Sequence, residues 1–362
     1  MRLLITGGGT GGHVYPLLAV LESLAAEHAI EIQTDVRFIG RGGSIEERLA
    51  GQAGIPFIPL RVRGLRTLAP WSLARNLWLM SRAETEAGKL VRTFKPDAVL
   101  ATGGYVSAPG IYAAAQQGVP VVIYLPDLEP GLAIRTMSRW AKCVAISFEE
   151  VKRHFAPGKA VVTGYPVRRS FLEATREKGR EHFQIPPRGN LVTVFGGSTG
   201  AHSINEAIRN NLSALLDVTQ VIHVTGKQDE AEMQAARESL PAYKQAGYHV
   251  YGYLDEDMPL ALAAADLVVA RAGAATLGEF PAVGVASVLV PYPYAGKHQE
   301  KNADFLVSHG AAVKVQDREL RTTLLPALKY LLENREQREH LTNGARALAQ
   351  PEAASNIAKL LK

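Results

Sequence analysis

Short apolar runs alternate with longer amphipathic stretches along most of the chain. Before residue 165, the runs that we interpret as strands read "RLLIT", "VRFIG", "DAVLAT", "VPVVIYL", "CVAIS" and "AVVTG". Unbroken apolar runs of this length are typical of strands buried on both faces, as in a parallel sheet covered by helices. The pattern therefore predicts an α/β fold.

The same pattern restarts after the polar passage "EKGREHFQIPPRGN" (177–190). A second strand and glycine loop follow in "LVTVFGGSTGAHSINEAI", and further strand-like runs read "QVIHVTG", "YHVYGYL", "DLVVARAG" and "ASVLVPYP". We expect two similarly built domains, the first over residues 1–165 and the second over 191–340. Residues 166–190 would link them, and a last helix over 341–362 would pack back on the first domain.

A glycine-rich loop joins the first strand to the first helix, in "LLITGGGTGGHVYPLLAV" (3–20). The apolar positions that follow the loop recur at helical spacing, at Val14, Leu17, Leu18 and Leu21. His13 therefore lies at a helix N-terminus, where unpaired N–H groups favour an anion and glycines let a ligand approach the backbone. The loop predicts a binding site.

Gly7, Gly9 and Gly12 also match the dinucleotide-binding pattern G-x-G-x-x-G, which on its own is weak. The second strand leads into Arg41, where that fingerprint requires an acidic residue for the ribose. An NADP-dependent oxidoreductase is therefore one alternative. A second glycine loop at 196–200 also follows a strand and opens a helix, and its N–H groups and hydroxyls could hold a diphosphate.

A third loop, "ARAGAATLGEFPAVG", narrows the choice of ligand for these glycine loops. We expect Ala274, Ala275 and Thr276 to begin a helix that carries Glu279 one turn in, where a carboxylate can accept two hydrogen bonds from a ribose diol. The next loop, "PYPYAGKHQEKNA", offers His298, Gln299 and Asn302, which are neutral groups of the kind that bind sugar hydroxyls. The alternative for "PYPYAGKHQEKNA" is a solvated loop without a ligand.

Composition narrows the class of protein only slightly. The 362 residues include 40 Lys plus Arg and 35 Asp plus Glu, a bias too weak to predict binding to nucleic acid. The single cysteine, Cys143, excludes an internal disulfide and a cysteine metal cluster, and its apolar surroundings predict a buried thiol. We expect no signal peptide and no membrane span, and hence a cytoplasmic protein.

The motifs together resemble one family along nearly the whole chain. They read "GGTGGHVYP" (8–16), "GGYVSAPG" (103–110), "GYPVR" (164–168), "GGSTGAHSIN" (196–205), "TGK" (225–227), "RAGAATLGE" (271–279) and "HQEKNA" (298–303). Most are weak alone, but in this order they are highly specific. The chain resembles the peptidoglycan N-acetylglucosaminyltransferases, glycosyltransferases of the GT-B type that convert lipid I to lipid II.

The resemblance implies a GT-B fold, with two Rossmann-like domains whose parallel sheets face each other across a cleft. The N-terminal domain would bind lipid I, which is undecaprenyl-pyrophosphoryl-N-acetylmuramyl peptide, and the C-terminal domain would bind UDP-N-acetylglucosamine. It also implies an inverting transfer with no metal and no cofactor besides the donor substrate. The enzyme would work at the cytoplasmic face of the cell membrane.

The resemblance also implies roles for individual residues. His13 would be the general base, or the group that positions the acceptor, for the C4 hydroxyl of N-acetylmuramic acid. The acceptor-binding residues would be Thr10, Gly11, Gly12, Tyr105 and Ser107. The donor-binding residues would be Asp127, Arg168, Ser198, Thr199, Gly200, Arg271, Gly273, Ala274, Thr276, Glu279, His298 and Gln299.

Three stretches depart from the family pattern. Tyr124-Leu125-Pro126-Asp127 stands where the family usually has His-Glu-Gln-Asn, Tyr165 replaces an asparagine, and Thr199 replaces a glutamine. A related glycosyltransferase for another lipid or a small aglycone would keep the nucleotide loops and differ at 124–127. A further alternative is a nucleotide-sugar sensor that binds without reacting.

The stretch "RVRGLRTLAPWSLARNLWLM" (61–80) is the candidate for contact with a membrane surface. Its apolar side chains are Leu68, Trp71, Leu73, Leu77, Trp78 and Met80, and its basic ones are Arg61, Arg63, Arg66 and Arg75. This combination is typical of an interfacial segment that faces anionic lipid, and a lipid-linked acceptor favours this interpretation. The alternative is a helix that packs on the core and has a solvated basic rim.

Overall fold

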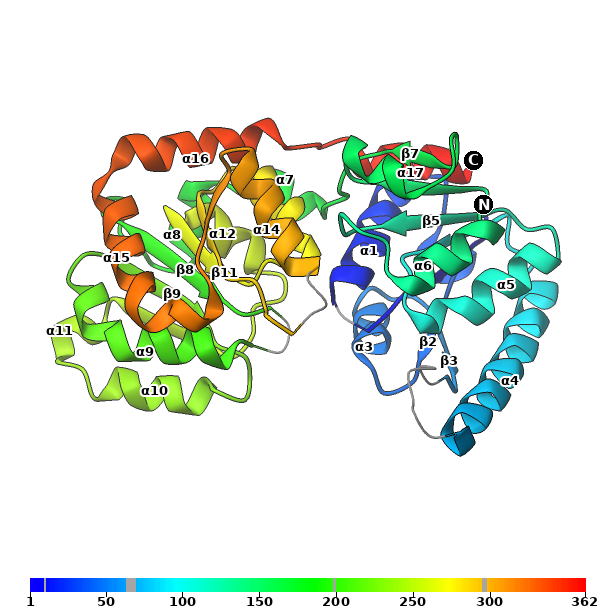
Figure 1. The fold of residues 1–362 in the computed structure, drawn as a ribbon, viewed down its shortest axis with the longest axis horizontal. Coiled ribbons are helices and arrows are strands. Elements are labelled where there is room, and N and C mark those ends of the chain that lie inside the picture. The colour runs from blue at the N-terminus through cyan, green and yellow to red at the C-terminus, as the bar shows by residue number, and fades with distance from the viewer. Residues whose placement is uncertain (10, 63–69, 198–199, 295–297) are drawn as a thin grey trace. The chain divides into compact units, whose positions relative to one another are not determined.

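The computed structural model describes residues 1–362 except 10, 63–69, 198–199 and 295–297, and it leaves out the side chains of residues 70–74 and 77. Contacts divide the chain into two units (Figure 1). Unit 1 comprises residues 1–168 and 351–362, and unit 2 comprises residues 169–350. Each unit contains one parallel sheet, as the alternating pattern predicts.

The sheet of unit 1 has seven strands in the order β3-β2-β1-β4-β5-β6-β7. Their bounds are β1 Leu3–Thr6, β2 Val36–Arg41, β3 Phe57–Leu60, β4 Ala98–Ala101, β5 Val121–Leu125, β6 Cys143–Ile146 and β7 Ala160–Val162. The helices are α1 Gly11–Ala26, α2 Ile32–Asp35, α3 Ile45–Gln52, α4 Pro70–Phe94, α5 Ala108–Gln116, α6 Leu132–Met137 and α17 Ala353–Leu361, with 3-10 turns η1 Tyr105–Ser107, η2 Ser138–Trp140 and η3 Glu149–His154.

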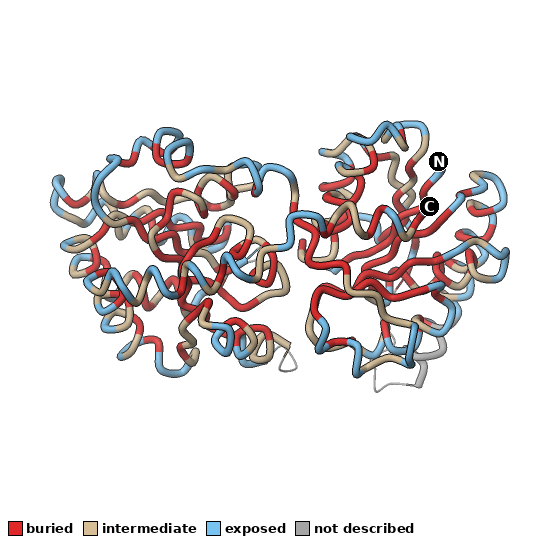
Figure 2. Tube along the Cα trace, turned by 90° about the horizontal axis from the view of Figure 1, so that it is seen from above, coloured by how far each residue is buried: buried red, intermediate tan, exposed pale blue. Residues whose placement is uncertain are grey.

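The helices of unit 1 form two groups, which cover the two faces of the sheet. Helix α1 contacts α3 and α17, whereas α4 contacts α5. On the second face, Leu4 and Val99 pack with Ala87 of α4 and Ile111 of α5. The central strands are buried along their whole length, in agreement with their unbroken apolar runs (Figure 2).

The sheet of unit 2 has six strands in the order β10-β9-β8-β11-β12-β13. Their bounds are β8 Leu191–Phe195, β9 Gln220–Val224, β10 Tyr248–Tyr251, β11 Leu267–Ala270, β12 Ser287–Leu289 and β13 Ala312–Lys314. The helices are α7 Arg169–Glu173, α8 Arg176–His182, α9 His202–Leu216, α10 Glu230–Glu238, α11 Ala242–Gln245, α12 Met258–Ala264, α13 Glu279–Val283, α14 His298–Ser308, α15 Leu320–Glu333 and α16 Arg335–Ala347, with η4 Ala274–Leu277 and η5 Asp317–Glu319.

Successive residues of β8 point to the two faces of this second sheet. Val192 and Val194 belong to a core with α9 and α15, whereas Leu191 packs with Ala261 and Ala264 of α12. Both sheets have the strand order of a Rossmann-like fold, in which the direction of winding reverses beside the first strand. No helix in the described part of the chain is long and apolar enough to cross a bilayer.

Two edge strands, β3 and β13, are absent from the sequence-based prediction. Each pairs with a single neighbour, β2 and β12 respectively. Strand β3 includes Pro59, which cannot donate a ladder hydrogen bond, and β13 is only three residues long. Their apolar runs are therefore too short to separate from the surrounding loops.

Candidate active site

The glycine loops lie where each sheet reverses its winding. Strands β1 and β4 are neighbours in unit 1, and β8 and β11 are neighbours in unit 2, although neither pair is consecutive in the chain. In open parallel sheets, ligands bind outside the carboxyl ends of the strands at this reversal. The fold thus places all three predicted loops, after β1, β8 and β11, at the expected ligand positions.

The loop after β1 is packed closely against the loop after β4. A Cβ atom on Gly7 would lie 2.0 Å from Oγ1 of Thr102, and a Cβ atom on Gly104 would lie 3.0 Å from the carbonyl oxygen of Gly8. Gly9 and Gly104 also have positive φ values of 98° and 78°. Glycine is therefore required here for both close approach and backbone conformation.

His13 lies in the first turn of α1, as predicted. Its carbonyl oxygen accepts a hydrogen bond of 2.6 Å from Oγ1 of Thr102, which follows β4. The ring nitrogen Nδ1 is enclosed and has no hydrogen-bond partner among the described residues. Burial lowers the pKa of His13, while the charges of Asp127 and Glu46 act in the opposite direction. Because the shift is downward, the imidazole is neutral at neutral pH and can accept a proton.

The other acceptor-side predictions lie around the same loops. Gly11 and Gly12 are the first two residues of α1, and Thr10 is outside the described residues. The hydroxyl of Ser107 donates a 2.6 Å hydrogen bond to the carbonyl of Gly103, so this side chain holds the loop after β4. Tyr105, the first residue of η1, is exposed at the loop surface.

A small cavity of about 150 Å³ adjoins the loop after β1. Gly8, Gly9, Arg41, Glu46 and Tyr105 contribute to its walls. Glu46 is only 2% exposed, and its Oε2 has no hydrogen-bond partner in the described part of the chain. Sequence reasoning missed this carboxylate, although the run Gly-Gly-Ser directly before α3 resembles the other loops that follow strands.

The residues that depart from the family pattern lie after β5. Tyr124 is fully buried, its hydroxyl lies 2.8 Å from Oγ of Ser147, and its ring packs edge-on against Tyr165 with 6.0 Å between centroids. Burial raises the pKa of Tyr124 well above its usual value. Asp127 is part-exposed, and its charge acts on both His13 and Tyr124.

Arg168 is the last residue of unit 1 before the chain enters unit 2. Its guanidinium carbon lies 4.6 Å from the ring centroid of Tyr15, two residues after His13 on α1. This cation–π contact ties the end of the unit to the helix that carries the candidate base.

In unit 2, the loop after β8 has the same dense packing as the loop after β1. A Cβ atom on Gly196 would lie 2.2 Å from the amide nitrogen of Ala201, and one on Gly200 would lie 2.5 Å from the carbonyl oxygen of Thr225. Gly200 has a φ of 80°, and α9 begins two residues later. The predicted donor residues Ser198 and Thr199 are outside the described residues.

Arg271, predicted to bind the donor, makes several contacts inside unit 2. Its guanidinium forms an ion pair with Asp317 at 2.5 Å, donates to Oγ of Ser203 at 2.8 Å, and donates to the carbonyl of Val290 at 3.2 Å. Ser203 also donates to Asp317 at 2.8 Å. These bonds join the loop after β11 to the first turn of α9.

The predicted single helix over Ala274–Glu279 is wrong in detail. The structure has a 3-10 turn η4 that ends at Leu277, and a separate helix α13 that begins at Glu279. Gly278, at φ −124° and ψ −46°, interrupts the helical conformation between them. The hydroxyl of Thr276 donates to the carbonyl of Gly273 at 2.8 Å, which closes the turn that includes Ala274. Glu279 is part-buried.

The stretch that begins at His298 is a helix, α14, so the alternative of a solvated loop is wrong. Oε1 of Gln299 accepts a 2.9 Å hydrogen bond from the amide of Tyr292. The fully buried Asn302 donates to the carbonyl of Ala272 at 3.1 Å. The start of α14 is thereby fastened to the loop after β11, which carries the other predicted donor residues.

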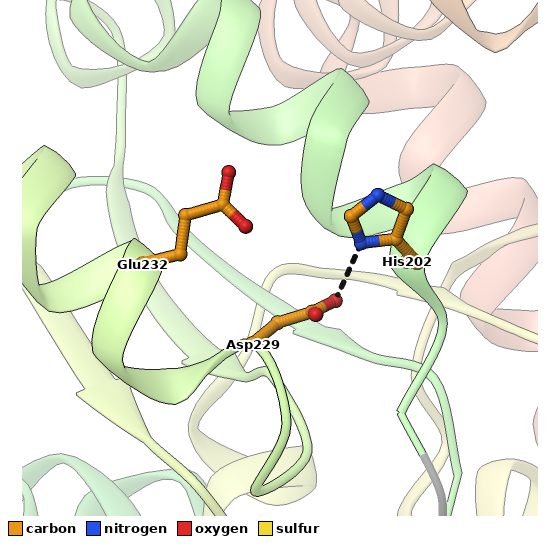
Figure 3. A group of neighbouring side chains, drawn as sticks. All are labelled: His202, Asp229 and Glu232. Atoms are coloured by element: carbon orange, nitrogen blue, oxygen red, sulfur yellow. Dashed lines mark hydrogen bonds and ion pairs between the residues drawn. The ribbon is translucent and has the colours of Figure 1, made fainter.

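One group of side chains in the described part of the chain has the composition of a metal site (Figure 3). Nδ1 of His202 lies 3.1 Å from Oδ2 of Asp229, and Glu232 lies close by. Both carboxylates already have partners within the protein: Asn205 donates a 2.7 Å hydrogen bond to Asp229, and Arg209 forms an ion pair with Glu232. Since metal ligands need their lone pairs, this arrangement does not favour a metal.

Two Rossmann-like sheets, each with a glycine loop where its winding reverses, have the architecture of the GT-B fold. Residues 3–146 match the glycosyltransferase family 28 N-terminal domain, and residues 191–361 match the family 28 C-terminal domain. The chain belongs to glycosyltransferase family 28.

Individual relatives cover the whole chain. A UDP-N-acetylglucosamine--N-acetylmuramyl-(pentapeptide) pyrophosphoryl-undecaprenol N-acetylglucosamine transferase of Moorella thermoacetica is 40% identical over 100% of this chain and 98% of its own. The transferase of the same name from Roseiflexus sp. is 39% identical over 100% of this chain and 94% of its own. The crystal structure of Acinetobacter baumannii MurG aligns with a TM-score of 0.74 and 30% identity over 99% of both chains.

Proposed function

We propose that the chain transfers N-acetylglucosamine from UDP-N-acetylglucosamine to the C4 hydroxyl of N-acetylmuramic acid in lipid I, which yields lipid II for peptidoglycan synthesis. The observation that carries the proposal is the full-length similarity to transferases whose names state this donor and this acceptor. The glycine loops and a neutral histidine at the start of α1 supply the chemistry that such a transfer needs.

His13 acts as the general base in the proposed reaction. Its Nε2 takes the proton of the C4 hydroxyl while the hydroxyl oxygen forms a bond to the anomeric carbon of N-acetylglucosamine. The bond from that carbon to the phosphate oxygen breaks, and UDP leaves with the electron pair on the side opposite to the attack. Configuration at the anomeric carbon is therefore inverted. Nε2 is the nitrogen available to substrate, because Nδ1 is enclosed.

The donor binds to unit 2 in this proposal. The N-terminus of α9 and the loop residues Ser198, Thr199 and Gly200 receive the diphosphate, because unpaired N–H groups there meet the charge that develops on UDP. Glu279 accepts hydrogen bonds from the ribose. The remaining contacts come from Gly273, Ala274, Thr276, His298 and Gln299. Arg271 holds this surface together through Asp317 and Ser203.

The acceptor binds to unit 1. The first turn of α1, with Thr10, Gly11 and Gly12, receives the diphosphate of the lipid, and Tyr105 lies beside it. Helix N-termini supply the positive potential on both sides of the reaction. The proposed mechanism therefore needs no bound metal and no cofactor besides the donor.

The enzyme acts as a peripheral protein on the cytoplasmic face of the cell membrane. Exposed apolar side chains on unit 1 support this part of the proposal: Trp78 is 57% exposed and Leu132 is 71% exposed. Each lies near arginines, since Arg82 lies over the Trp78 ring and Arg135 is on the same helix as Leu132. Apolar side chains among cations suit an anionic lipid surface.

Only part of the predicted membrane stretch bears on this proposal. Met80 packs against the core of unit 1. Arg61 and Arg75 are exposed, as an interfacial segment requires. Leu68, Arg63 and Arg66 lie outside the described residues, as do the side chains of Trp71, Leu73 and Leu77.

The test is release of UDP from UDP-N-acetylglucosamine with purified lipid I, with diacylglycerol, or with no acceptor. We expect release with lipid I and a disaccharide product by mass spectrometry, and His13→Ala serves as the matched inactive variant. Release with diacylglycerol instead would show that the differences at residues 124–127 accompany another acceptor. Tight donor binding without release for any acceptor would indicate a sensor.

A further inference from the structure

A buried carboxylate lines the small cavity beside the loop after β1. Glu46 belongs to the first turn of α3, the helix that follows β2, and is only 2% exposed. Its Oε1 accepts a long hydrogen bond of 3.4 Å from the amide of Arg41, and its Oε2 has no hydrogen-bond partner among the described residues. Because a buried acceptor oxygen without a donor costs free energy, this carboxylate is suited to receive a hydrogen-bond donor from a ligand.

The same carboxylate lies against the glycine loop itself. A Cβ atom on Gly8 would lie 2.4 Å from Oε1 and 3.1 Å from Oε2 of Glu46. Gly8 and Gly9 line the cavity together with Glu46. The charge of Glu46 also raises the pKa of His13, although burial has the larger and opposite effect. Glu46 therefore adjoins the backbone that leads into α1, where the proposed function places the diphosphate of the acceptor.

The cavity has room for one substituent of a sugar. Its volume of about 150 Å³ is that of a cavity that holds a single benzene molecule. Among the described residues that line it, Glu46 supplies the one carboxylate and the exposed Arg41 supplies a positive charge. The hydroxyl of Ser44 donates to the carbonyl of Arg41. A buried carboxylate does not suit a lipid chain, so the cavity favours a polar group that can donate a hydrogen bond.

The place of Glu46 in the fold indicates which polar group this is. In Rossmann-like folds, the glycine loop after the first strand binds a diphosphate, and a carboxylate after the second strand binds hydroxyl groups of the attached sugar. Strand β2 is the neighbour of β1 and ends at Arg41, and Glu46 follows in the first turn of α3. Glu46 thus brings a carboxylate to the sugar side of the loop, although Arg41 stands where the sequence pattern requires an acidic residue.

We propose that Glu46 is a specificity-determining residue, which accepts a hydrogen bond from the C6 hydroxyl of the acceptor's N-acetylmuramic acid, and that the cavity beside Gly8 and Gly9 holds this hydroxymethyl group. The identity of the acceptor in this statement rests on the proposed function. The choice of hydroxyl follows from the sugar. C1 carries the diphosphate, C3 carries the lactyl ether and C4 carries the nucleophile, so C6 bears the remaining hydroxyl.

The test compares two acceptors, lipid I and 6-deoxy lipid I, in which hydrogen replaces the C6 hydroxyl. For the wild type, kcat/KM with lipid I should exceed that with the 6-deoxy acceptor by roughly 10- to 100-fold, the effect of one hydrogen bond to a carboxylate. In Glu46→Met, which keeps the length of the side chain and removes its oxygens, this ratio should fall close to one.

Two further variants sharpen the comparison. Glu46→Gln keeps one acceptor oxygen without the charge and should have an intermediate ratio. Glu47→Gln is the matched control, because it removes the neighbouring charge from the same helix and keeps an oxygen that can accept from the amide of Gly43. Its ratio should equal that of the wild type. The KM for UDP-N-acetylglucosamine should be unchanged in all three variants.

A merely structural role of Glu46 would lower kcat/KM equally for both acceptors, and the unchanged ratio would overturn the proposal. Equal use of the two acceptors by the wild type would also overturn it, even if Glu46→Met failed to fold. A third acceptor has an ester in place of the acetamido group and so lacks its N–H. If the preference that depends on Glu46 followed this N–H instead, the assignment of the C6 hydroxyl would be wrong.

Turnover of lipid I by the wild type decides the proposed function separately. If no UDP is released, that function fails, and the comparison is made by binding. N-acetylmuramic acid 1-phosphate and its 6-deoxy form are titrated into isotope-labelled protein without donor, and chemical shifts are followed by NMR. The wild type should bind the first compound more tightly, and Glu46→Met should bind both equally. Equal binding of the two compounds to the wild type would overturn the role of Glu46.

Discussion

The buried His223 makes a specific prediction about stability and pH. It lies on β9 in unit 2, where Nδ1 is 2.7 Å from the Tyr248 hydroxyl and Nε2 is 3.0 Å from Oδ1 of Asn205. The amide group of Asn205 donates to Thr225 and Asp229, so its Oδ1 must accept. Nε2 of His223 therefore carries the hydrogen, and Nδ1 accepts from Tyr248.

Protonation of His223 would add a hydrogen to Nδ1. Two donors, Nδ1 and the Tyr248 hydroxyl, would then face each other. Burial lowers the pKa of His223 to about 3. In the unfolded chain the value is about 6.5, so between these limits the unfolded state binds a proton that the folded state does not. The contribution of His223 to the free energy of unfolding is therefore present in full above pH 6.5 and decreases as the pH falls toward 3. From pH 7 to pH 5, this one group removes about 2 kcal/mol from the free energy of unfolding.

The assay is urea unfolding at pH 7 and pH 5, for the wild type and for His223→Gln, which cannot be protonated. The three tryptophans, Trp71, Trp78 and Trp140, all lie in unit 1, so their fluorescence does not follow unit 2. Unfolding is therefore followed by far-ultraviolet circular dichroism, to which the helices of both units contribute. We expect His223→Gln to be less stable at pH 7, because its geometry cannot keep both hydrogen bonds. Between pH 7 and pH 5, its free energy of unfolding should also decrease by about 2 kcal/mol less than that of the wild type.

The exposed His340, changed to glutamine, is the matched control and should keep the wild-type pH dependence. His13 and His249 also have lowered pKa values and add to the total loss of stability in acid. The difference between variants isolates His223 from them. If wild type and His223→Gln lost the same free energy between pH 7 and pH 5, the assignment of a neutral His223 would be refuted.

Three further predictions concern the proposed reaction. His13→Ala should lower kcat by about 10² to 10⁴-fold with an unchanged donor KM, and near-normal turnover in steady-state assays would remove His13 from the chemistry. Glu279→Ala should raise the donor KM by roughly 10- to 30-fold through two lost hydrogen bonds of about 1 kcal/mol each, and an unchanged KM would exclude a ribose contact. Trp78→Ser combined with Leu132→Ser should release the protein from anionic vesicles in flotation assays, whereas loss of folding in circular dichroism would show that these side chains stabilise the core.

The central strands of both sheets could be predicted from the sequence, because their burial on two faces demands unbroken apolar runs. The edge strands β7 and β10 were also predicted, but the edge strands β3 and β13 could not be. Strand β3 has only one buried residue, Leu60, and strand β13 has Ala312. An edge strand needs less apolar surface than a central one, so its signal merges with that of the neighbouring loops.

The glycine loops were predictable for a different reason. A strand, several glycines and a helix start form a local pattern that determines where a backbone can approach a ligand. Glu46 has no such pattern, because its burial depends on Gly8 in the loop after β1 and on Gly40 of β2, which approach it from two separate parts of the chain. The break at Gly278 was also missed, since a single glycine inside an apolar stretch does not distinguish one helix from two.

The sequence shows the departures at Tyr124 and Tyr165 as two separate differences, whereas the structure shows one contact. The two rings pack edge-on, and the Tyr124 hydroxyl is satisfied by Ser147 within the same buried layer. A histidine at position 124 alone would leave space beside Tyr165, and an asparagine at 165 alone would leave the Tyr124 ring without its partner. The pair therefore has to change together and preserves a packed core below the site.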